Sequence, residues 1–292
     1  MSDPEYLTAK RTVDDRALNA RVFDSFVTAL ADRADDGSVS VLEVGAGTGT
    51  MIARLAERGV LPSDVSYRAV DRDPAHVAAG RTQVPEWLAA AGYSVQEAED
   101  NIVATRGENR IEIRFEVADA FAIDASADVC IAMAMLDLVD LPEALELLGD
   151  HLEPGGLLYA PLTFDGGTGF APVHSADPAI EQAYHRHMDA IRDGGGPRAG
   201  RQLLDAVPLV GGEILAVGGS TQVIHPQDAT YPAREDVVLS HVLETVGEAV
   251  REVPDTALSP GAIDEWLAVR RDQLDRAGLS FVASNLDVLA RF

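Results

Sequence analysis

Short apolar runs alternate along the middle of the chain with segments that carry an apolar residue at every third or fourth position. The runs are rich in β-branched residues and predict buried strands at 39–44, 65–71, 111–118, 127–133 and 157–163. The helical spacing predicts helices at 49–58, 74–91 and 142–151. Strands that alternate with helices indicate a mostly parallel sheet with helices on both faces. We therefore expect an α/β core over residues 37–164.

The pattern changes on both sides of this core. Apolar positions between residues 12 and 30 recur at helical spacing, so residues 1–36 are expected to form an N-terminal helical segment. After residue 164, Gly, Pro and Asp become frequent. Helices are expected there at 179–192, 203–207, 234–251 and 260–277, with a sixth strand at 213–217. Residues 165–278 are thus expected to be a late helical cap insertion, followed by a final core strand within 279–292.

Three alternating glycines follow the first predicted strand, in the sequence Glu43-Val-Gly45-Ala46-Gly47-Thr-Gly49. A strand, a glycine turn and a helix in succession allow bare backbone to approach a nucleotide-like ligand closely. A dinucleotide fingerprint that starts at Gly45 requires glycine at position 50, where the chain has Thr50. The spacing therefore disfavours a NAD-dependent oxidoreductase.

The glycine sequence resembles motif I of the class I S-adenosylmethionine-dependent methyltransferases. Four further blocks follow in the family's order, namely Asp71, Asp119-Ala120, the run 133–138 and Pro154-Gly155-Gly156. The resemblance covers residues 39–164 and implies a Rossmann-like sheet with S-adenosylmethionine as cofactor. It implies that Asp71 binds the ribose hydroxyls and Asp119 the adenine amino group. The cofactor-binding residues expected are Glu43, Gly45, Ala46, Gly47, Gly49, Asp71, Arg72, Asp119, Ala120 and Ala134.

The methyl acceptor is not identified by any motif. The fourth strand lacks a following Asn/Asp-Pro-Pro-Tyr/Phe run and Cys130 lies inside that strand, so methylation of nucleobases is not indicated. Transfer from a sulfonium needs an oriented acceptor, and a base where the acceptor carries a proton. The catalytic candidates are Asp137, Tyr184 and His187, followed by Asp165 and His174; packing of Tyr184 and His187 in the cap is an open alternative.

Two further hypotheses concern segments outside the motifs. In small-molecule methyltransferases an N-terminal helix often closes over the cofactor, so Tyr6, Lys10 and Arg16 are candidates to bind its carboxylate. Gly194–Gly196 is a candidate lid hinge, with an ordinary surface loop as the alternative. The His and Cys residues lack the spacing of a metal site, so no metal is expected.

Charge narrows the expected partners. The formal net charge is −25, and Lys10 is the single lysine among 23 basic residues. Such acidic, lysine-poor chains resemble halophilic proteins from a salt-saturated cytoplasm, where screening removes self-repulsion. An acidic surface repels phosphate, so we expect a small-molecule substrate and neither nucleic acid nor an anionic membrane as partner. The acidic N-terminus, the lack of a long apolar run and the single cysteine favour a cytoplasmic location.

The function expected is therefore O- or N-methylation of a small molecule by in-line transfer from S-adenosylmethionine. Two alternatives share motif I with this function. One is another S-adenosylmethionine-type transferase, such as an aminopropyl transferase that uses the decarboxylated cofactor. The other is a non-catalytic module that binds the cofactor. The sequence leaves the acceptor and the oligomeric state open.

Overall fold

A single mixed sheet forms the centre of the molecule in the computed structural model, which describes residues 3–34, 37–99, 101–190, 195–254 and 257–292. Its nine strands are ordered β3-β4-β5-β2-β1-β6-β7-β9-β8. The pairs β5–β2, β2–β1, β1–β6 and β6–β7 are parallel, and the remaining pairs are antiparallel. The strands are β1 (Val39–Val44), β2 (Asp64–Asp71), β3 (Ser94–Glu97), β4 (Ile102–Arg106), β5 (Asn109–Val117), β6 (Ala127–Ile131), β7 (Leu152–Ala171), β8 (Glu213–Ile224) and β9 (Ser280–Arg291).

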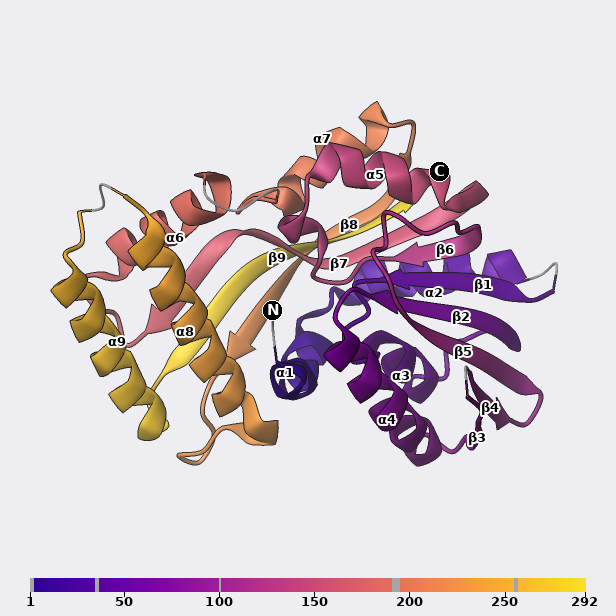
Figure 1. Cartoon of the computed structure of the whole chain (residues 1–292), viewed down its shortest axis with the longest axis horizontal. Helices are drawn as coiled ribbons and strands as arrows, with labels where there is room; N and C mark the ends of the chain where they lie inside the picture. Colours follow the sequence, from indigo (N-terminus) through magenta and orange to yellow (C-terminus); the bar gives the residue numbers. More distant parts are fainter. Residues whose placement is uncertain (1–2, 35–36, 100, 191–194, 255–256) are drawn as a thin grey trace.

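Helices cover both faces of the sheet, as expected for a Rossmann-like α/β fold (Figure 1). Helices α2, α3 and α4 pack on one face and α5 and α7 on the other. The helices are α1 (Pro4–Ala17), α2 (Ala20–Arg33), α3 (Thr50–Glu57), α4 (Pro74–Ala90), α5 (Leu141–Asp150), α6 (Asp177–Ala190), α7 (Ala199–Leu209), α8 (Glu235–Glu252) and α9 (Pro260–Asp275), with short 3-10 turns at Leu136–Leu138 and Pro232–Arg234. Within the described residues, none of these helices has the length and apolar character needed to cross a membrane.

The N-terminal segment differs from the prediction of one helix over 12–30. It forms two helices, because the side chain of Asn19 accepts a hydrogen bond from the backbone N–H of Val22 at 3.2 Å and so begins α2. The first helix begins earlier than predicted, at Pro4, where Asp3 caps it by accepting from the N–H of Glu5. Residues 35–36, at the predicted end of the segment, lie outside the described residues.

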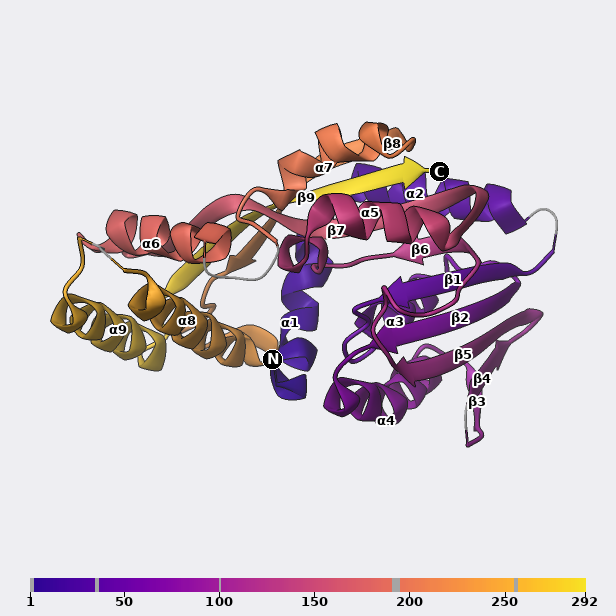
Figure 2. The ribbon, with the colours of Figure 1, turned by 45° about the horizontal axis from the view of Figure 1, so that its top comes forward.

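The cap is built on the same sheet as the core. Strands β7, β8 and β9 continue beyond the core, and α6, α8 and α9 pack on their extensions around a separate apolar cluster (Figure 2). Strand β7 therefore runs through residue 164, where a domain boundary was predicted, and β9 begins in the cap and ends in the core. The cap thus extends the sheet rather than covering one of its edges.

Helix α1 lies between the core and the cap (Figures 1 and 2). On the cap side, Arg16 donates to the buried carboxylate of Glu235 on α8 through Nη1 at 2.7 Å and Nη2 at 2.9 Å. On the core side, the hydroxyl of Thr8 donates to Gln83 Oε1 on α4 at 2.9 Å. The N-terminal helix is thereby placed over the ends of the parallel strands, where ligands bind in open α/β sheets.

Candidate functional site

A cavity of about 550 Å³, called here the inner cavity, lies where β1, β2, β5 and β6 end. Its floor is formed by the glycine loop, residues 45–48, and by the segments after β2, β5 and β6. Its other walls come from α1, α6 and α8 and from the extensions of β7, β8 and β9. The volume falls within the range of about 300–1,000 Å³ that is typical of small-molecule sites. Among the described residues, no group of His, Cys, Asp and Glu is arranged to hold a metal ion.

The glycine loop faces the cavity with bare backbone. Gly45 and Gly47 line it and have φ angles of +63° and +54°, a left-handed conformation that favours glycine. A Cβ atom on Gly45 would lie 2.9 Å from Met135 Cγ, and one on Gly47 would lie 3.1 Å from Leu7 Cδ1. The loop therefore needs glycine both for its conformation and for the close approach of its neighbours. Ala46, between these glycines, also lines the cavity.

Glu43 and Gly49 lie behind the loop and do not line the inner cavity. The buried carboxylate of Glu43 accepts a hydrogen bond from the hydroxyl of Tyr67 at 2.8 Å. Burial raises the pKa of Glu43 from 4.5 to about 8, although the Tyr67 hydrogen bond and the Arg54 charge act in the opposite direction. A Cβ on Gly49 would lie 2.7 Å from Val84 Cγ2, so this glycine allows α3 and α4 to pack together. The structure thus brings both residues to the loop but not to the cavity itself.

Asp71, at the end of β2, lines the cavity and also organises it. Its Oδ2 accepts the N–H of Gly47 at 2.8 Å, and its Oδ1 accepts the N–H of Asp73 at 2.8 Å. His76 Nδ1 lies 3.2 Å from the same Oδ1. The carboxylate therefore fixes the glycine loop and the start of α4 relative to each other. Each oxygen of the Asp71 carboxylate can accept more than one hydrogen bond. Asp71 can therefore still accept hydrogen bonds from a ligand.

The remaining predicted cofactor residues also line the cavity. Arg72 and Asp119 are exposed, whereas Ala120 is buried, and Asp119 Oδ1 accepts the N–H of Phe121 at 3.0 Å. Ala134 has a φ of +50°, which is uncommon for a residue with a side chain. Leu162, which lines the cavity from β7, has a φ of +58°. Strained backbone of this kind is concentrated at functional sites.

The structure separates the catalytic candidates. Asp137 and Tyr184 line the inner cavity. His187 does not, because its Nε2 lies 2.8 Å from Glu252 Oε2 on α8. The structure thus brings Asp137 and Tyr184, but not His187, to the inner cavity.

The two further candidates also point elsewhere. Asp165 is paired with Arg201 at 2.8 Å, and His174 Nδ1 accepts the N–H of Ala176 at 3.2 Å before α6. Gly194, part of the candidate hinge, lies outside the described residues.

The N-terminal helix supplies residues that the sequence analysis identified only in part. Tyr6 and Lys10 line the inner cavity, whereas Arg16 is held by Glu235. Asp14 also lines the cavity and was missed, together with Gln222, His241 and Asn285. The signal for Asp14 was a carboxylate on the face of α1 that carries the buried residues Ala9, Val13 and Ala17. Because the helix was predicted to begin at residue 12, the buried face of α1, which includes Asp14, was not recognised.

Comparisons with known proteins find a similarity to methyltransferases. Residues 42–160 match the family model of a methyltransferase domain. A search of curated proteins found no match. Among solved structures, the chain is similar to an S-adenosylmethionine-dependent methyltransferase from Geobacter sulfurreducens in complex with S-adenosyl-L-homocysteine, at 15% identity over 99% of each chain and a TM-score of 0.45. It is also similar to geranyl diphosphate C-methyltransferase from Streptomyces coelicolor, at 13% identity over 93% of this chain and 79% of that chain, with a TM-score of 0.42.

The matched region contains motif I, Asp71, Asp119 and the Pro154-Gly155-Gly156 turn, and it spans the strands that form the floor of the inner cavity. The match over residues 42–160 supports a class I S-adenosylmethionine-dependent methyltransferase. The same match supports an enzyme that uses S-adenosylmethionine as its cofactor.

Proposed function

We propose that this methyltransferase transfers the methyl group to an oxygen or nitrogen of a small molecule bound in the inner cavity. The observation that carries the proposal is the continuity of this cavity. It extends from the glycine loop to the space between α1 and the cap, where Tyr6, Asp14 and Tyr184 line it. One cavity thus offers room for an acceptor beside the cofactor.

The residues of the cavity floor fit S-adenosylmethionine. Gly45 and Gly47 form a backbone cradle that side chains would fill, and the buried hydroxyl of Thr48 beside them has no hydrogen-bond partner among the described residues. In this proposal Asp71 binds the ribose, and Asp119 and Ala120 bind the adenine. Arg72, Ala46 and Ala134 border the cofactor, while Glu43 and Gly49 shape the loop from behind. In this proposal Lys10 and Tyr6 bind its carboxylate.

The chain contributes orientation, desolvation and a proton acceptor. When bound, S-adenosylmethionine would supply a methyl group on a positively charged sulfur. A lone pair of the acceptor, held in line with the bond from sulfur to methyl, would take the methyl group as the sulfur leaves. The apolar side chains of Leu162, Phe164 and Met188 exclude water from the cavity wall. Of the catalytic candidates, Asp137 and Tyr184 line the cavity. In this proposal they orient the acceptor or take its proton.

A product assay tests this proposal. The enzyme is incubated with methyl-labelled S-adenosylmethionine and a set of small alcohols, phenols and amines, and the small-molecule fraction is examined for label. We expect labelled product together with S-adenosylhomocysteine, and a reduced rate in Asp137→Asn and Tyr184→Phe but not in His187→Gln. Methylthioadenosine formed from the decarboxylated cofactor would instead identify an aminopropyl transferase. Cofactor binding without transfer to any acceptor would identify a binding module.

A further inference from the structure

One side of α8 forms a wall of the inner cavity, and it differs in charge from the rest of this helix. The lining residues recur at positions i, i+3, i+4, i+7 and i+8, which is the spacing of a single helix face. This cavity face of α8 consists of Val238, His241, Val242, Thr245 and Val246. The exposed acidic residues of the helix lie at other positions, among them Asp236, Glu244 and Glu248. In a chain with a net charge of −25, the side of α8 toward the cavity thus carries three valines and no carboxylate.

The strand extensions of the cap add further apolar side chains to the cavity wall. Phe164 on β7, Ile224 on β8, and Phe281 and Ala283 on β9 line the cavity. Ile224, Phe281 and Ala283 belong to the buried apolar cluster of the cap, and Phe164 packs against that cluster. The cavity wall is therefore continuous with the apolar core of the cap. A ligand that fills this end of the cavity removes apolar surface from water.

The charged side chains that reach this end of the cavity are paired with each other. Oδ1 of Asp14 accepts hydrogen bonds from Lys10 Nζ and from Gln222 Nε2, both at 2.6 Å. Asp137 follows β6 on the cofactor side, where the proposed function uses it to orient the acceptor or to take its proton. A charged group on the body of an acceptor would lose its hydration among these apolar walls and would find Asp14 and Lys10 already paired. This end of the cavity therefore favours an uncharged ligand.

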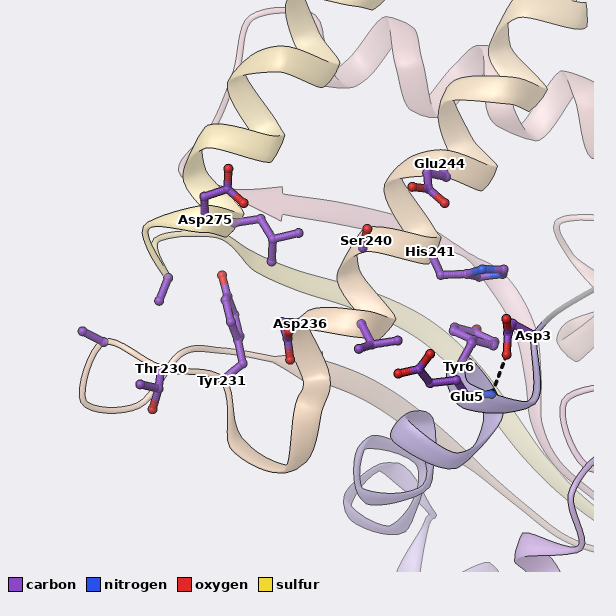
Figure 3. A pocket seen from close by; sticks show the side chains of 14 residues that line it. Asp3, Glu5, Tyr6, Thr230, Tyr231, Asp236, Ser240, His241, Glu244 and Asp275 are labelled. Carbon is purple, nitrogen blue, oxygen red and sulfur yellow. Dashed lines mark hydrogen bonds between the residues drawn. The ribbon is translucent and has the colours of Figure 1, made fainter. Parts of the chain in front are cut away.

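Two rings separate this apolar space from an acidic outer hollow of about 750 Å³ (Figure 3). Tyr6 and His241 line both cavities, and their ring centroids lie 4.0 Å apart. Burial raises the pKa of Tyr6 and lowers the pKa of His241, which favours the neutral form of both rings. The carboxylates that line the outer hollow do not line the inner cavity, and they are Asp3, Glu5, Asp236, Glu244 and Asp275. These exposed carboxylates thus lie on one side of the ring pair and the apolar walls on the other.

We propose that the methyl acceptor has an uncharged, mainly apolar body, which binds between the cavity face of α8 and the extensions of β7, β8 and β9. Its reacting oxygen or nitrogen lies toward the cofactor, near Asp137 and Tyr184. The proposal rests on the proposed function, because it assigns a substrate class to the same site. Apolar walls with a few polar groups that fix the orientation of the ligand are typical of small-molecule sites.

Probes with one carbon chain and different end groups test the proposal. Titration calorimetry on the full chain, saturated with S-adenosylhomocysteine, compares n-hexanol with 1,6-hexanediol, 6-amino-1-hexanol and 6-hydroxyhexanoate. We expect n-hexanol to bind at least about tenfold more tightly than the other three, because their second polar or charged group is buried without a partner. From n-butanol to n-hexanol the affinity should rise by about threefold for each methylene, as expected when each methylene is buried.

A pair of variants on α8 tests where the apolar body binds. Val242→Asn places an amide in the cavity face of α8 and should lower the affinity for n-hexanol by at least about fivefold. The affinity for S-adenosylhomocysteine should stay unchanged. Val237→Asn is the matched control, because Val237 is also half-buried on α8 but lines the outer hollow and not the inner cavity. This variant should bind n-hexanol as the wild-type chain does.

The outcomes separate this proposal from the one on which it rests. If S-adenosylhomocysteine does not bind, the proposed function fails and this proposal fails with it. If S-adenosylhomocysteine binds but n-hexanol is not preferred over the diol, the amine and the carboxylate, only the apolar acceptor is overturned. Undiminished n-hexanol binding by a folded Val242→Asn would overturn the role of the cavity face of α8. The comparison of probes in the wild-type chain decides the acceptor class even where Val242→Asn does not fold.

Discussion

Gly47 donates its backbone N–H to Oδ2 of Asp71 at 2.8 Å. This hydrogen bond joins the glycine loop after β1 to the end of β2, while Oδ1 of the same carboxylate accepts the N–H of Asp73 at the start of α4. One side chain therefore fixes two of the segments that form the floor of the inner cavity. Asp71 organises the site in addition to its proposed contact with the ribose.

Replacing Asp71 should weaken cofactor binding and also loosen the loop. In Asp71→Ala we expect the affinity for S-adenosylhomocysteine to fall by at least about tenfold and the free energy of unfolding to fall by about 1–3 kcal/mol, since two backbone donors lose their acceptor. Calorimetry and urea denaturation measure the two effects. Asp64→Asn, at the exposed start of the same strand, is the control and should change neither quantity appreciably. Wild-type affinity in Asp71→Ala would contradict the assignment.

The conformation of Gly47 permits a second test. Gly47→Val places a β-branched residue at a φ of +54° and adds side-chain atoms to the cavity side of the loop. We expect loss of measurable S-adenosylhomocysteine binding by a chain that still folds, as judged by circular dichroism. Gly107→Val is a matched control, because Gly107 has a φ of +63° with open space around it and lies outside the inner cavity. Equal loss of binding in both variants would show that backbone strain, and not the site, is responsible.

Glu43 should make stability depend on pH. Because burial raises its pKa from 4.5 to about 8, the folded state holds the proton more tightly than the unfolded state. This contribution to stability is complete below about pH 4.5 and is lost as the pH rises through 8. We expect the wild-type free energy of unfolding to fall between pH 5 and 9, relative to Glu43→Gln, by more than about 1.4 kcal/mol, the equivalent of one pKa unit. A constant difference across this range would show that Glu43 does not titrate there.

Asp287 should be important for stability rather than for binding. The side chain is fully buried and accepts from Asn19 N at 2.7 Å, Leu162 N at 2.8 Å and Ser220 Oγ at 2.6 Å. It thereby connects the start of α2 to β7, β8 and β9. We expect Asp287→Ala to lower the free energy of unfolding by about 2–4 kcal/mol in urea denaturation, because it leaves several buried donors unpaired. Asp205→Ala, at an exposed position on α7, should have an effect within about 0.5 kcal/mol.

Much of the core could be predicted because its signals are local. The apolar runs and the glycine positions of motif I set β1, β2, β5, β6 and the helices between them. The hairpin β3–β4 was missed, since β3 is short and mostly exposed at the sheet edge. The lengths of β7 and β8 were underestimated, because their extensions are stabilised by packing against the cap helices rather than by their own sequence pattern.

Only the part of the site that a family motif covers could be predicted from the sequence. The cofactor side follows from residues near the ends of consecutive strands. The acceptor side combines Asp14 from α1, Gln222 from β8 and His241 from α8, which are far apart in the sequence. No spacing rule relates such residues before the fold is known. The position of His187 beside Glu252 could not be predicted, because helical periodicity gives the face of a helix but not its partner on another element.

The central claim is that the glycine loop and Asp71 bind S-adenosylmethionine in the inner cavity, with an acceptor beside it. Titration of the purified chain with S-adenosylhomocysteine in molar potassium chloride tests this most directly, because salt screens the net charge of −25. We predict saturable binding at one site, which Gly47→Val and Asp71→Ala weaken and Gly107→Val does not. The absence of binding by the folded wild-type chain, or equal binding by all three variants, would contradict the account.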